Sequence, residues 1–236
     1  RPRQELLRSL TPVTAAERVT ARIVTGAANA RDLVQFRQGC AGLPALKTQL
    51  GAFQTSLLRV VAETLDDLRD LRQAVEAAIA DEPPFSLREG GLIRPGYSEE
   101  VDRLRDIMSG GKGTLARIEA EEKEKTGIKN LRVGYNRVFG YYIEVAKGQV
   151  DLVPDSYIRK QTLVNGERYI TQELKELENT ILGAKDRVNS LEYELFTAPR
   201  DKLAANAPRL VALPSPRTKI DKAPLLSEQY PTDPAG

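Results

Sequence analysis

Basic, hydroxyl and amide side chains gather among tyrosines between residues 131 and 177 of this 236-residue chain. Arginine and lysine neutralise the charge of nucleic-acid phosphates, and hydroxyl and amide groups bind phosphate oxygens without reading bases. The polar candidates for such contacts are Gln161, Thr162 and Asn165. The composition fits equally well a small β-sheet with a solvated outer face, in which most of the tyrosines would form the core. The basic candidates are Arg132, Arg137, Lys147, Arg159, Lys160 and Arg168.

The chain contains no histidine and a single cysteine, Cys40. These counts exclude a Ser-His or Cys-His nucleophile pair, an imidazole base and an ordinary zinc site. Carboxylates occur mainly in runs with lysine and arginine, such as residues 117–125, which is typical of a solvated helix face. We therefore predict no catalytic residue, no metal ligand and no cofactor, and we expect Cys40 to be a buried helix residue.

The segment from Gly110 to Thr114 is similar to a phosphate-binding loop but lacks its spacing. A Walker A loop needs Gly-x-x-x-x-Gly-Lys-Ser/Thr after a strand. Here Gly113 separates Lys112 from Thr114, and Asp106 occupies the position of the first glycine. The surrounding pattern is that of a helix. We therefore reject a nucleotide-binding site at this segment.

The overall composition predicts a well-solvated helical protein. Charged residues make up 29% of the chain and hydrophobic residues 41%, and the net charge is +2. So small a net charge means that affinity for nucleic acid has to come from a local basic patch. The chain has no run of about 18 apolar residues and no signal-peptide pattern, so we expect a soluble cytoplasmic protein without a membrane partner.

Two long helices are predicted on either side of the tyrosine-rich segment. Their apolar or small residues recur in alternating steps of three and four, the spacing of a coiled-coil seam. At roughly 28 to 30 residues and about 1.5 Å per residue, each helix would be near 40–45 Å long. A break of the first helix at Gly111 is an alternative, because several glycines weaken it there. The seam residues are Val101, Leu104, Met108, Gly111, Leu115 and Ile118 in the first helix, and Leu174, Leu177, Ile181, Ala184, Val188, Leu191 and Leu195 in the second.

The segment between these helices alternates with the period of β-strands. Residues 132–135 and 139–146 predict a hairpin with its turn at 136–138. Residues 157–164 and 168–170 predict two further strands around an Asn-Gly turn, joined to the hairpin by an irregular linker. Because the two helices flank this insert, we expect them to pair antiparallel with the insert at their far end.

The two ends of the chain predict different structures. The first 80 residues predict several short helices, with Thr14 and Glu17 at the spacing of a capping box and Asn29 as an N-cap. Residues 211–236 contain five of the chain's 14 prolines and show no periodicity, so we expect them to be disordered.

Four stretches carry a resemblance to the MutS family of bacterial DNA mismatch-repair proteins, which covers residues 15–210. The most specific is GYNRVFGYYIEV, followed by VPDSYIRKQTLVNGERYITQELKELENTILGAKDRVNSLEYELF. The others are RIVTGAANARDLVQFRQGCAGLPAL and the run from IRPGYSEEVDRLRDIM through LARIEAEEKEKTGIKNLRVGYN.

The resemblance implies the same mainly α fold as the patterns do: a helical core, long antiparallel lever helices and a small antiparallel β clamp inserted at their tip. We divide the chain accordingly into a helical core with the first lever helix (1–129), the β clamp (130–170), the returning lever helix (171–210) and a proline-rich tail (211–236). The resemblance implies that the clamp contacts the duplex backbone. First-rank candidates in the matched segment are Arg159, Lys160, Thr162, Asn165 and Arg168, and second-rank candidates are Lys147, Arg132 and Arg137.

The resemblance also implies partners and domains beyond this chain. Full-length members form homodimers that encircle double-stranded DNA, with an N-terminal mismatch-detecting domain and a C-terminal ATPase that acts through the levers. The chain contains neither a Phe-x-Glu mismatch-reading motif nor a Walker A loop. We therefore expect a middle fragment or truncated product that is not itself an enzyme, works with the remaining MutS domains and associates with the bacterial nucleoid. The unmatched residues 211–236 suggest a frameshifted or alternative terminus.

A rival hypothesis is a structural helical scaffold whose β tip is a protein-docking or dimer contact. Phosphate binding predicts that the six basic residues share one exposed face of the insert. Docking predicts an exposed aromatic patch there instead.

Overall fold

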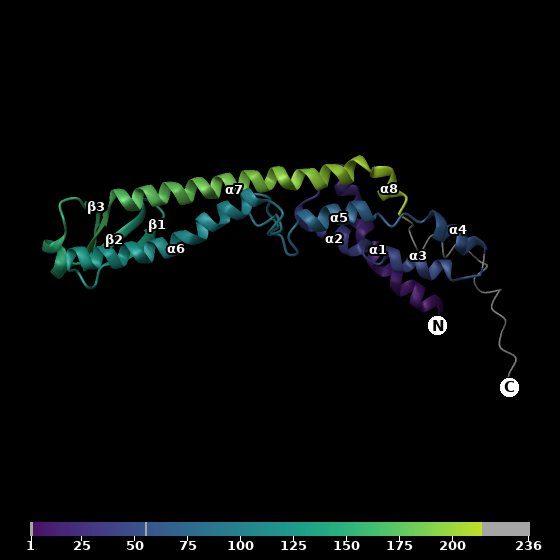
Figure 1. The fold of residues 1–236 in the computed structure, drawn as a ribbon, viewed down its shortest axis with the longest axis horizontal. Coiled ribbons are helices and arrows are strands. Elements are labelled where there is room, and N and C mark those ends of the chain that lie inside the picture. The colour runs from purple at the N-terminus through teal and green to yellow at the C-terminus, as the bar shows by residue number, and fades with distance from the viewer. Residues whose placement is uncertain (1, 55, 214–236) are drawn as a thin grey trace, which may run out of the picture. The chain divides into compact units, whose positions relative to one another are not determined.

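The computed structural model describes residues 2–54 and 56–213, which form two compact units (Figure 1). The first unit combines residues up to 97 with those from 192 onward, and the second consists of residues 98–191. The described chain is mainly helical and contains a small antiparallel sheet, so the predicted fold class is confirmed.

The first unit is built from helices that bury aliphatic and aromatic side chains in one core. Phe36 and Phe196 are both fully buried there, so segments distant in sequence share this core. Removal of their apolar surface from water stabilises the unit by roughly 25 cal/mol per Å². Its helices are α1 (Pro2–Val24), α2 (Ala30–Cys40), α3 (Leu43–Gly51), α4 (Ser56–Thr64), α5 (Arg69–Ala78), the C-terminal part of α7 (Gln172–Ala205) and α8 (Ala207–Val211).

The helix α1 is continuous although it contains Pro12. Thr14 therefore lies inside the helix, and the predicted capping box of Thr14 and Glu17 is wrong. A proline inside a helix removes one backbone hydrogen bond. That loss is offset here because the apolar stripe continues past the proline, and it comprises the fully buried residues Val13, Ala16, Val19 and Ile23.

The junction of α1 and α2 is fixed by a capping box at Asn29, which confirms the predicted N-cap. The Asn29 side chain accepts a hydrogen bond from the Asp32 amide at 2.9 Å. The Asp32 carboxylate in turn accepts hydrogen bonds from the Asn29 amide at 3.0 Å and from Nε of Arg22 at 3.1 Å. Cys40, the last residue of α2, is fully buried as predicted.

The second unit begins with α6 (Glu99–Thr126), a single helix of 28 residues. Ser98 caps its start by accepting a hydrogen bond from the Val101 amide at 3.3 Å. Gly127 ends it with a φ of 72°, a left-handed conformation that glycine adopts without steric cost. The alternative of two helices joined near Gly111 is therefore wrong.

Within the second unit, α6 and α7 run antiparallel, as predicted. Arg117 lies 3.4 Å from Glu173, and Gly111 packs against Ile181, so residue numbers fall along one helix as they rise along the other. With 34 residues, α7 is longer than predicted. The additional turns at its C-terminal end belong to the core of the first unit, which stabilises them.

The sheet lies between α6 and α7 in the sequence and has the strand order β1-β2-β4-β3, with every neighbouring pair antiparallel. One face packs against the two helices, where Ile143, Val145 and Tyr169 contact the cluster of Ile118 and Leu174. A 3₁₀ helix, η1 (Lys147–Leu152), occupies the linker that carried no predicted structure. The strands are β1 (Arg132–Asn136), β2 (Gly140–Ala146), β3 (Ile158–Thr162) and β4 (Gly166–Ile170).

Three of the five tyrosines of the insert contribute to its core, as predicted. Tyr157 and Tyr169 are buried, and the half-buried Tyr141 packs against the same cluster. Tyr142 projects to the outer face of the sheet, and Tyr135, on an edge strand, is 55% exposed.

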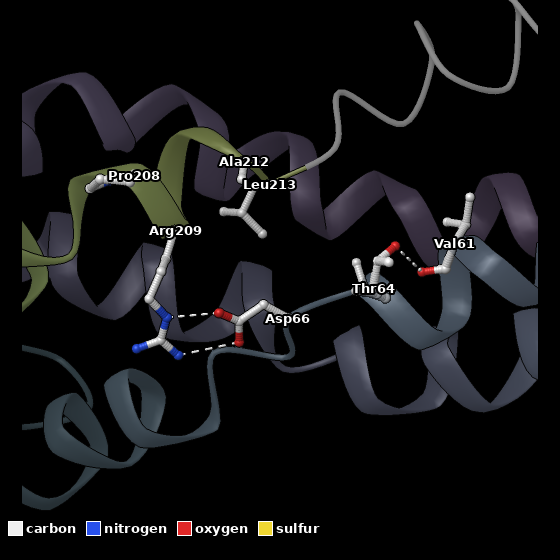
Figure 2. A pocket seen from close by; sticks show the side chains of 8 residues that line it. Val61, Thr64, Asp66, Pro208, Arg209, Ala212 and Leu213 are labelled. Atoms are coloured by element: carbon white, nitrogen blue, oxygen red, sulfur yellow. Dashed lines mark hydrogen bonds and ion pairs between the residues drawn. The ribbon is translucent and has the colours of Figure 1, made fainter.

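The short helix α8 is held to the first unit by Arg209, which reaches from α8 to Asp66 beyond the end of α4 (Figure 2). Its Nε lies 2.7 Å from Asp66 Oδ2, and its Nη2 lies 2.8 Å from Asp70 Oδ1. The two charged residues that line the shallow pocket beside α8, Asp66 and Arg209, are thus paired with each other. The predicted disordered tail begins at residue 211, but Val211 is the last residue of α8 and Leu213 is buried. Residues 214–236 lie outside the described residues, and so does the hypothesis of an altered terminus.

The attachment of α8 is expected to weaken in acid. Hydrogen bonds from Arg209 lower the pKa of Asp70 to about 2 and also lower the pKa of Asp66. Because both carboxyls have lower pKa values in the folded state, their contribution is complete above about pH 4 and is lost as the pH falls towards 2. Urea unfolding at pH 5 and pH 2.5 should therefore show that Arg209→Met destabilises the protein at pH 5 and much less at pH 2.5.

The exposed Arg59 supplies a matched control for this experiment, since its substitution by methionine leaves the Asp66 and Asp70 contacts intact. Arg59→Met should not change the pH dependence of unfolding. If Arg209→Met lowered the free energy of unfolding equally at both pH values, the ion pairs of Arg209 with Asp66 and Asp70 would not be the cause of the acid sensitivity.

Candidate nucleic-acid interface

One end of the sheet brings together candidates that are distant in sequence. It is the end at which β1 begins, β2 and β3 end and β4 begins, and we call it the β3–β4 end. The Lys147 amide donates a hydrogen bond to the Asn165 carbonyl oxygen at 2.9 Å, which places the start of η1 beside the β3–β4 turn. Arg132, the first residue of β1, and Thr162, the last of β3, belong to the same end. All four of these residues are exposed.

Arg159 and Lys160 lie on β3, which is an edge strand. The pairing with β4 shifts between Arg159 and Gln161, so Lys160 is the additional residue of a β-bulge. Such a bulge twists an edge strand and redirects its side chains. Both cationic side chains are exposed, and the guanidinium of Arg159 lies 3.4 Å from Glu167.

Arg168 differs from the other candidates because its guanidinium is held within the outer face of the sheet. Its Nε donates to Glu144 Oε2 at 2.8 Å, and its Nη1 donates to Gln161 Oε1 at 2.9 Å. The guanidinium also lies 4.3 Å from the centre of the Tyr142 ring, a cation–π arrangement. Three strands are thereby joined through one half-buried side chain.

The six basic candidates do not share one face of the sheet. Residues paired across neighbouring strands point to the same side, so Arg132 and Arg168, which both pair with Glu144, lie on the outer face. Arg159 pairs with the core residue Tyr169 and therefore projects to the other side. Arg137 lies in the β1–β2 turn at the opposite end. The phosphate-binding hypothesis predicted a single basic face, and the register of the strands contradicts that detail.

The alternative criterion, an exposed aromatic patch, is met only locally. Tyr135 is 55% exposed, and its ring centre lies 5.1 Å from that of Tyr141. Val138, in the adjacent turn, is 91% exposed. These apolar side chains lie at the β1–β2 end, away from the gathering of polar residues at the β3–β4 end.

Sequence reasoning missed Lys129. This exposed residue lies in the turn between α6 and β1, and so it precedes the β1 residues at the β3–β4 end. Lys129 stands only three positions before Arg132, but it precedes the tyrosine-rich segment, which begins at residue 131.

Two buried tyrosines of the insert donate hydrogen bonds to carboxylates, one on α6 and one on the same strand. The Tyr157 hydroxyl donates to Glu122, a carboxylate of α6 that is 6% exposed. Burial, together with this bond, raises the pKa of Tyr157 well above its ordinary value. Burial and a hydrogen bond to Glu167 likewise raise the pKa of Tyr169 to about 12. Both hydroxyls therefore keep their protons at neutral pH and serve as donors.

A carboxylate of α6 also covers the edge of β1. Glu119 accepts a hydrogen bond from the Val133 amide at 3.0 Å and pairs with Lys123 at 2.8 Å. The Lys123 bond is the main reason why the pKa of Glu119 is lowered. The β1 edge is thus attached to α6.

Within residues 2–54 and 56–213, we find no group of three or more histidine, cysteine, aspartate or glutamate side chains arranged to hold a metal ion. Over the same residues, no helix has the length and apolar character needed to cross a membrane.

Comparison with known proteins identifies the family to which this architecture belongs. A model of MutS family domain IV matches residues 96–187, which contain the entire sheet and the helical segments that flank it. A DNA mismatch repair protein MutS of Acetivibrio thermocellus is 45% identical over 225 residues, which is 95% of this chain and 26% of that protein. Proteins of the same name from Ruminiclostridium cellulolyticum and Symbiobacterium thermophilum are 46% and 49% identical over 90% and 88% of this chain, and over 24% of each relative.

The chain belongs to the MutS family. Its MutS domain IV coincides closely with the second structural unit, residues 98–191. The chain spans about a quarter of the length of these curated relatives. The residues gathered at the β3–β4 end and along β3 all lie in this MutS domain.

Proposed function

We propose that this chain is a DNA-holding part of a mismatch-repair protein, and that its MutS domain IV contacts the phosphate backbone of double-stranded DNA. The observation that carries the proposal is the gathering of exposed cationic and polar side chains along β3 and at the β3–β4 end. It is supported by the relatives, each of which is named a DNA mismatch repair protein. The contacting residues are Arg132, Lys147, Arg159, Lys160, Thr162 and Asn165, together with Lys129.

The proposed contacts bind phosphates and do not read bases. Flexible lysine and arginine side chains on an exposed strand edge neutralise phosphate charge, while Thr162 and Asn165 add hydrogen bonds. Arg168 has a different proposed role, because Glu144 and Gln161 already occupy its guanidinium. It keeps three strands in register and so positions the contacts made by its neighbours.

We place this activity within a larger assembly. The partners proposed are the remaining MutS domains and a second copy in a homodimer, in the bacterial cytoplasm at the nucleoid. No catalytic step is assigned to this chain, and the ATPase activity of the family is proposed to lie in parts of the protein beyond it.

Protein docking is a second candidate for one end of the sheet. Arg137 and the highly exposed Val138 lie in the β1–β2 turn beside Tyr135, where an apolar contact with a protein partner or a second copy would be favourable. This candidate predicts that the β1–β2 turn contributes nothing to DNA affinity.

Duplex binding measured against salt concentration tests the DNA proposal. The double variant Arg159→Gln/Lys160→Gln should bind duplex DNA more weakly. The slope of log K against log salt should become shallower by about 1 for each phosphate contact removed. The loss should be the same for matched and mismatched duplexes, since phosphates carry no sequence information. Fluorescence anisotropy of the full chain at several salt concentrations provides the measurement.

Two variants serve as controls. Arg137→Gln, at the other end of the sheet, should leave the salt slope unchanged. Arg168→Gln should lower thermal stability because it loses contacts to Glu144 and Gln161. Binding that does not respond to salt, no binding at low salt, or a selective loss on mismatched duplexes would refute the proposal.

A further inference from the structure

The helix α6 contains three glycines within four positions, Gly110, Gly111 and Gly113, near the middle of its 28 residues. Glycine is among the poorest helix formers, because its backbone loses the most freedom on folding. A helix with three glycines in one turn is therefore more flexible at that turn than elsewhere along its length.

Packing accounts for only one of these glycines. A Cβ atom on Gly111 would lie 2.5 Å from Cδ1 of Ile181 on α7, so the close contact of the two helices requires glycine there. Gly110 and Gly113 are exposed, and a Cβ atom on either would meet nothing within 4 Å. Alanine would fit at both positions and would strengthen the helix. The two exposed glycines therefore reduce rigidity with no gain in packing.

The facing helix is weakened at the same level. Gly183 on α7 is exposed, and a Cβ atom there would also meet nothing within 4 Å. It lies two residues from Ile181, the partner of Gly111, so the flexible turns of the two antiparallel helices stand opposite each other.

The seam is packed on both sides of this level. Towards the sheet, Ile118 and Leu174 are 1% and 0% exposed. Towards the base of the unit, Val101 and Val188 are 0% and 3% exposed. The glycine level therefore lies between two packed regions, and it differs from them in carrying the exposed glycines Gly110, Gly113 and Gly183.

We propose that residues 109–114 of α6 and the turn around Gly183 of α7 form a hinge in the helix pair, with the Gly111–Ile181 contact as its pivot. The sheet-bearing end of the second unit then swings relative to the base of the same unit, where α6 begins. This hinge does not depend on what the sheet binds.

Distances between two spin labels test the hinge in the full chain. Asp151→Cys in η1 and Ser190→Cys in α7 introduce exposed thiols at the two ends of the unit, while the native Cys40 is fully buried. The triple variant Gly110→Ala/Gly113→Ala/Gly183→Ala should give a narrower distance distribution than the parent. A control, Glu124→Ala/Lys175→Ala, strengthens the two helices at exposed positions outside the hinge and should leave the width unchanged.

Hydrogen exchange provides a second readout. The Gly111, Lys112 and Thr114 amides should exchange about 30-fold more slowly in Gly110→Ala/Gly113→Ala, since two such substitutions each stabilise the local helix. An unchanged width of the distance distribution in the triple variant would overturn the hinge. So would equal narrowing in the Glu124→Ala/Lys175→Ala control, or unchanged exchange of these amides.

Discussion

Replacement of Glu192 by alanine is expected to destabilise the first unit by about 3 kcal/mol. Glu192 lies on α7 and is 1% exposed. Its Oε2 accepts a hydrogen bond from the Gly91 amide at 2.7 Å, and its Oε1 accepts one from the Ile93 amide at 3.2 Å. Alanine would remove both acceptors and leave the two amides without them, and hydrogen bonds to a charged group each contribute about 1.5–3 kcal/mol.

These two bonds join α7 to a segment that the core also holds, since Leu92 and Ile93 are buried. Ile93 forms an isolated antiparallel bridge with Ile79, directly after α5, and Gly91 has a φ of 77°. The carboxylate therefore attaches the irregular chain after α5 to α7. Chemical denaturation monitored by circular dichroism measures the decrease in the free energy of unfolding of the Glu192→Ala protein.

Two variants make the Glu192 experiment specific. Glu194→Ala, at an exposed position two residues further along α7, should change stability by less than about 0.5 kcal/mol. Glu192→Gln keeps the shape and one acceptor oxygen, so its loss should lie between those of the two alanine variants. A Glu192→Ala protein as stable as Glu194→Ala would show that the buried carboxylate contributes nothing.

The sequence does not identify the partners of Glu192. The residue stands between Leu191 and Tyr193, and its partners lie 99 and 101 positions away. Periodicity reports which face of a helix is apolar, and it does not report a carboxylate that enters a core to bind backbone amides. Such a contact depends on the folded positions of two distant segments.

Elements with a regular period were predictable. The seam residues of α6 and α7 and the alternation in β1 and β2 are local patterns, and they predicted the helix pair and the first hairpin of the antiparallel sheet. The continuation of α1 through Pro12 was missed, because tertiary burial outweighs the local effect of the proline. The 3₁₀ helix η1 has no strong local pattern and was also missed.

The arrangement of the candidate residues could not be predicted from composition. Composition selected a candidate segment, whereas a bulge of one residue at Lys160 decides which side chains of β3 face which side. The engagement of Arg168 with Glu144 and Gln161 likewise follows from strand register. Neither could be obtained without the pairing of β2, β3 and β4.

Gly140→Ala is expected to destabilise the second unit by about 2–3 kcal/mol. Gly140 begins β2 with a φ of 85°, a left-handed conformation that residues with a Cβ atom rarely adopt. A Cβ atom there would also overlap the carboxylate of Glu178 on α7. Glu178 would have to move away from the Tyr141 amide, from which its Oε2 is 3.4 Å distant. The hairpin would thus lose its contact with α7 as well as its backbone geometry.

Separate substitutions distinguish these two causes. Because backbone strain is the larger part, the double variant Gly140→Ala/Glu178→Ala should recover less than half of the stability lost by Gly140→Ala. Gly148→Ala provides a matched control in the same insert, since a Cβ atom there meets nothing within 4 Å, and it should have little effect. Tyrosine fluorescence during urea unfolding reports on this unit, because five of the eight tyrosines lie in residues 130–170. If Gly140→Ala unfolded like Gly148→Ala, the left-handed turn at residue 140 would not be required to hold the sheet against α7.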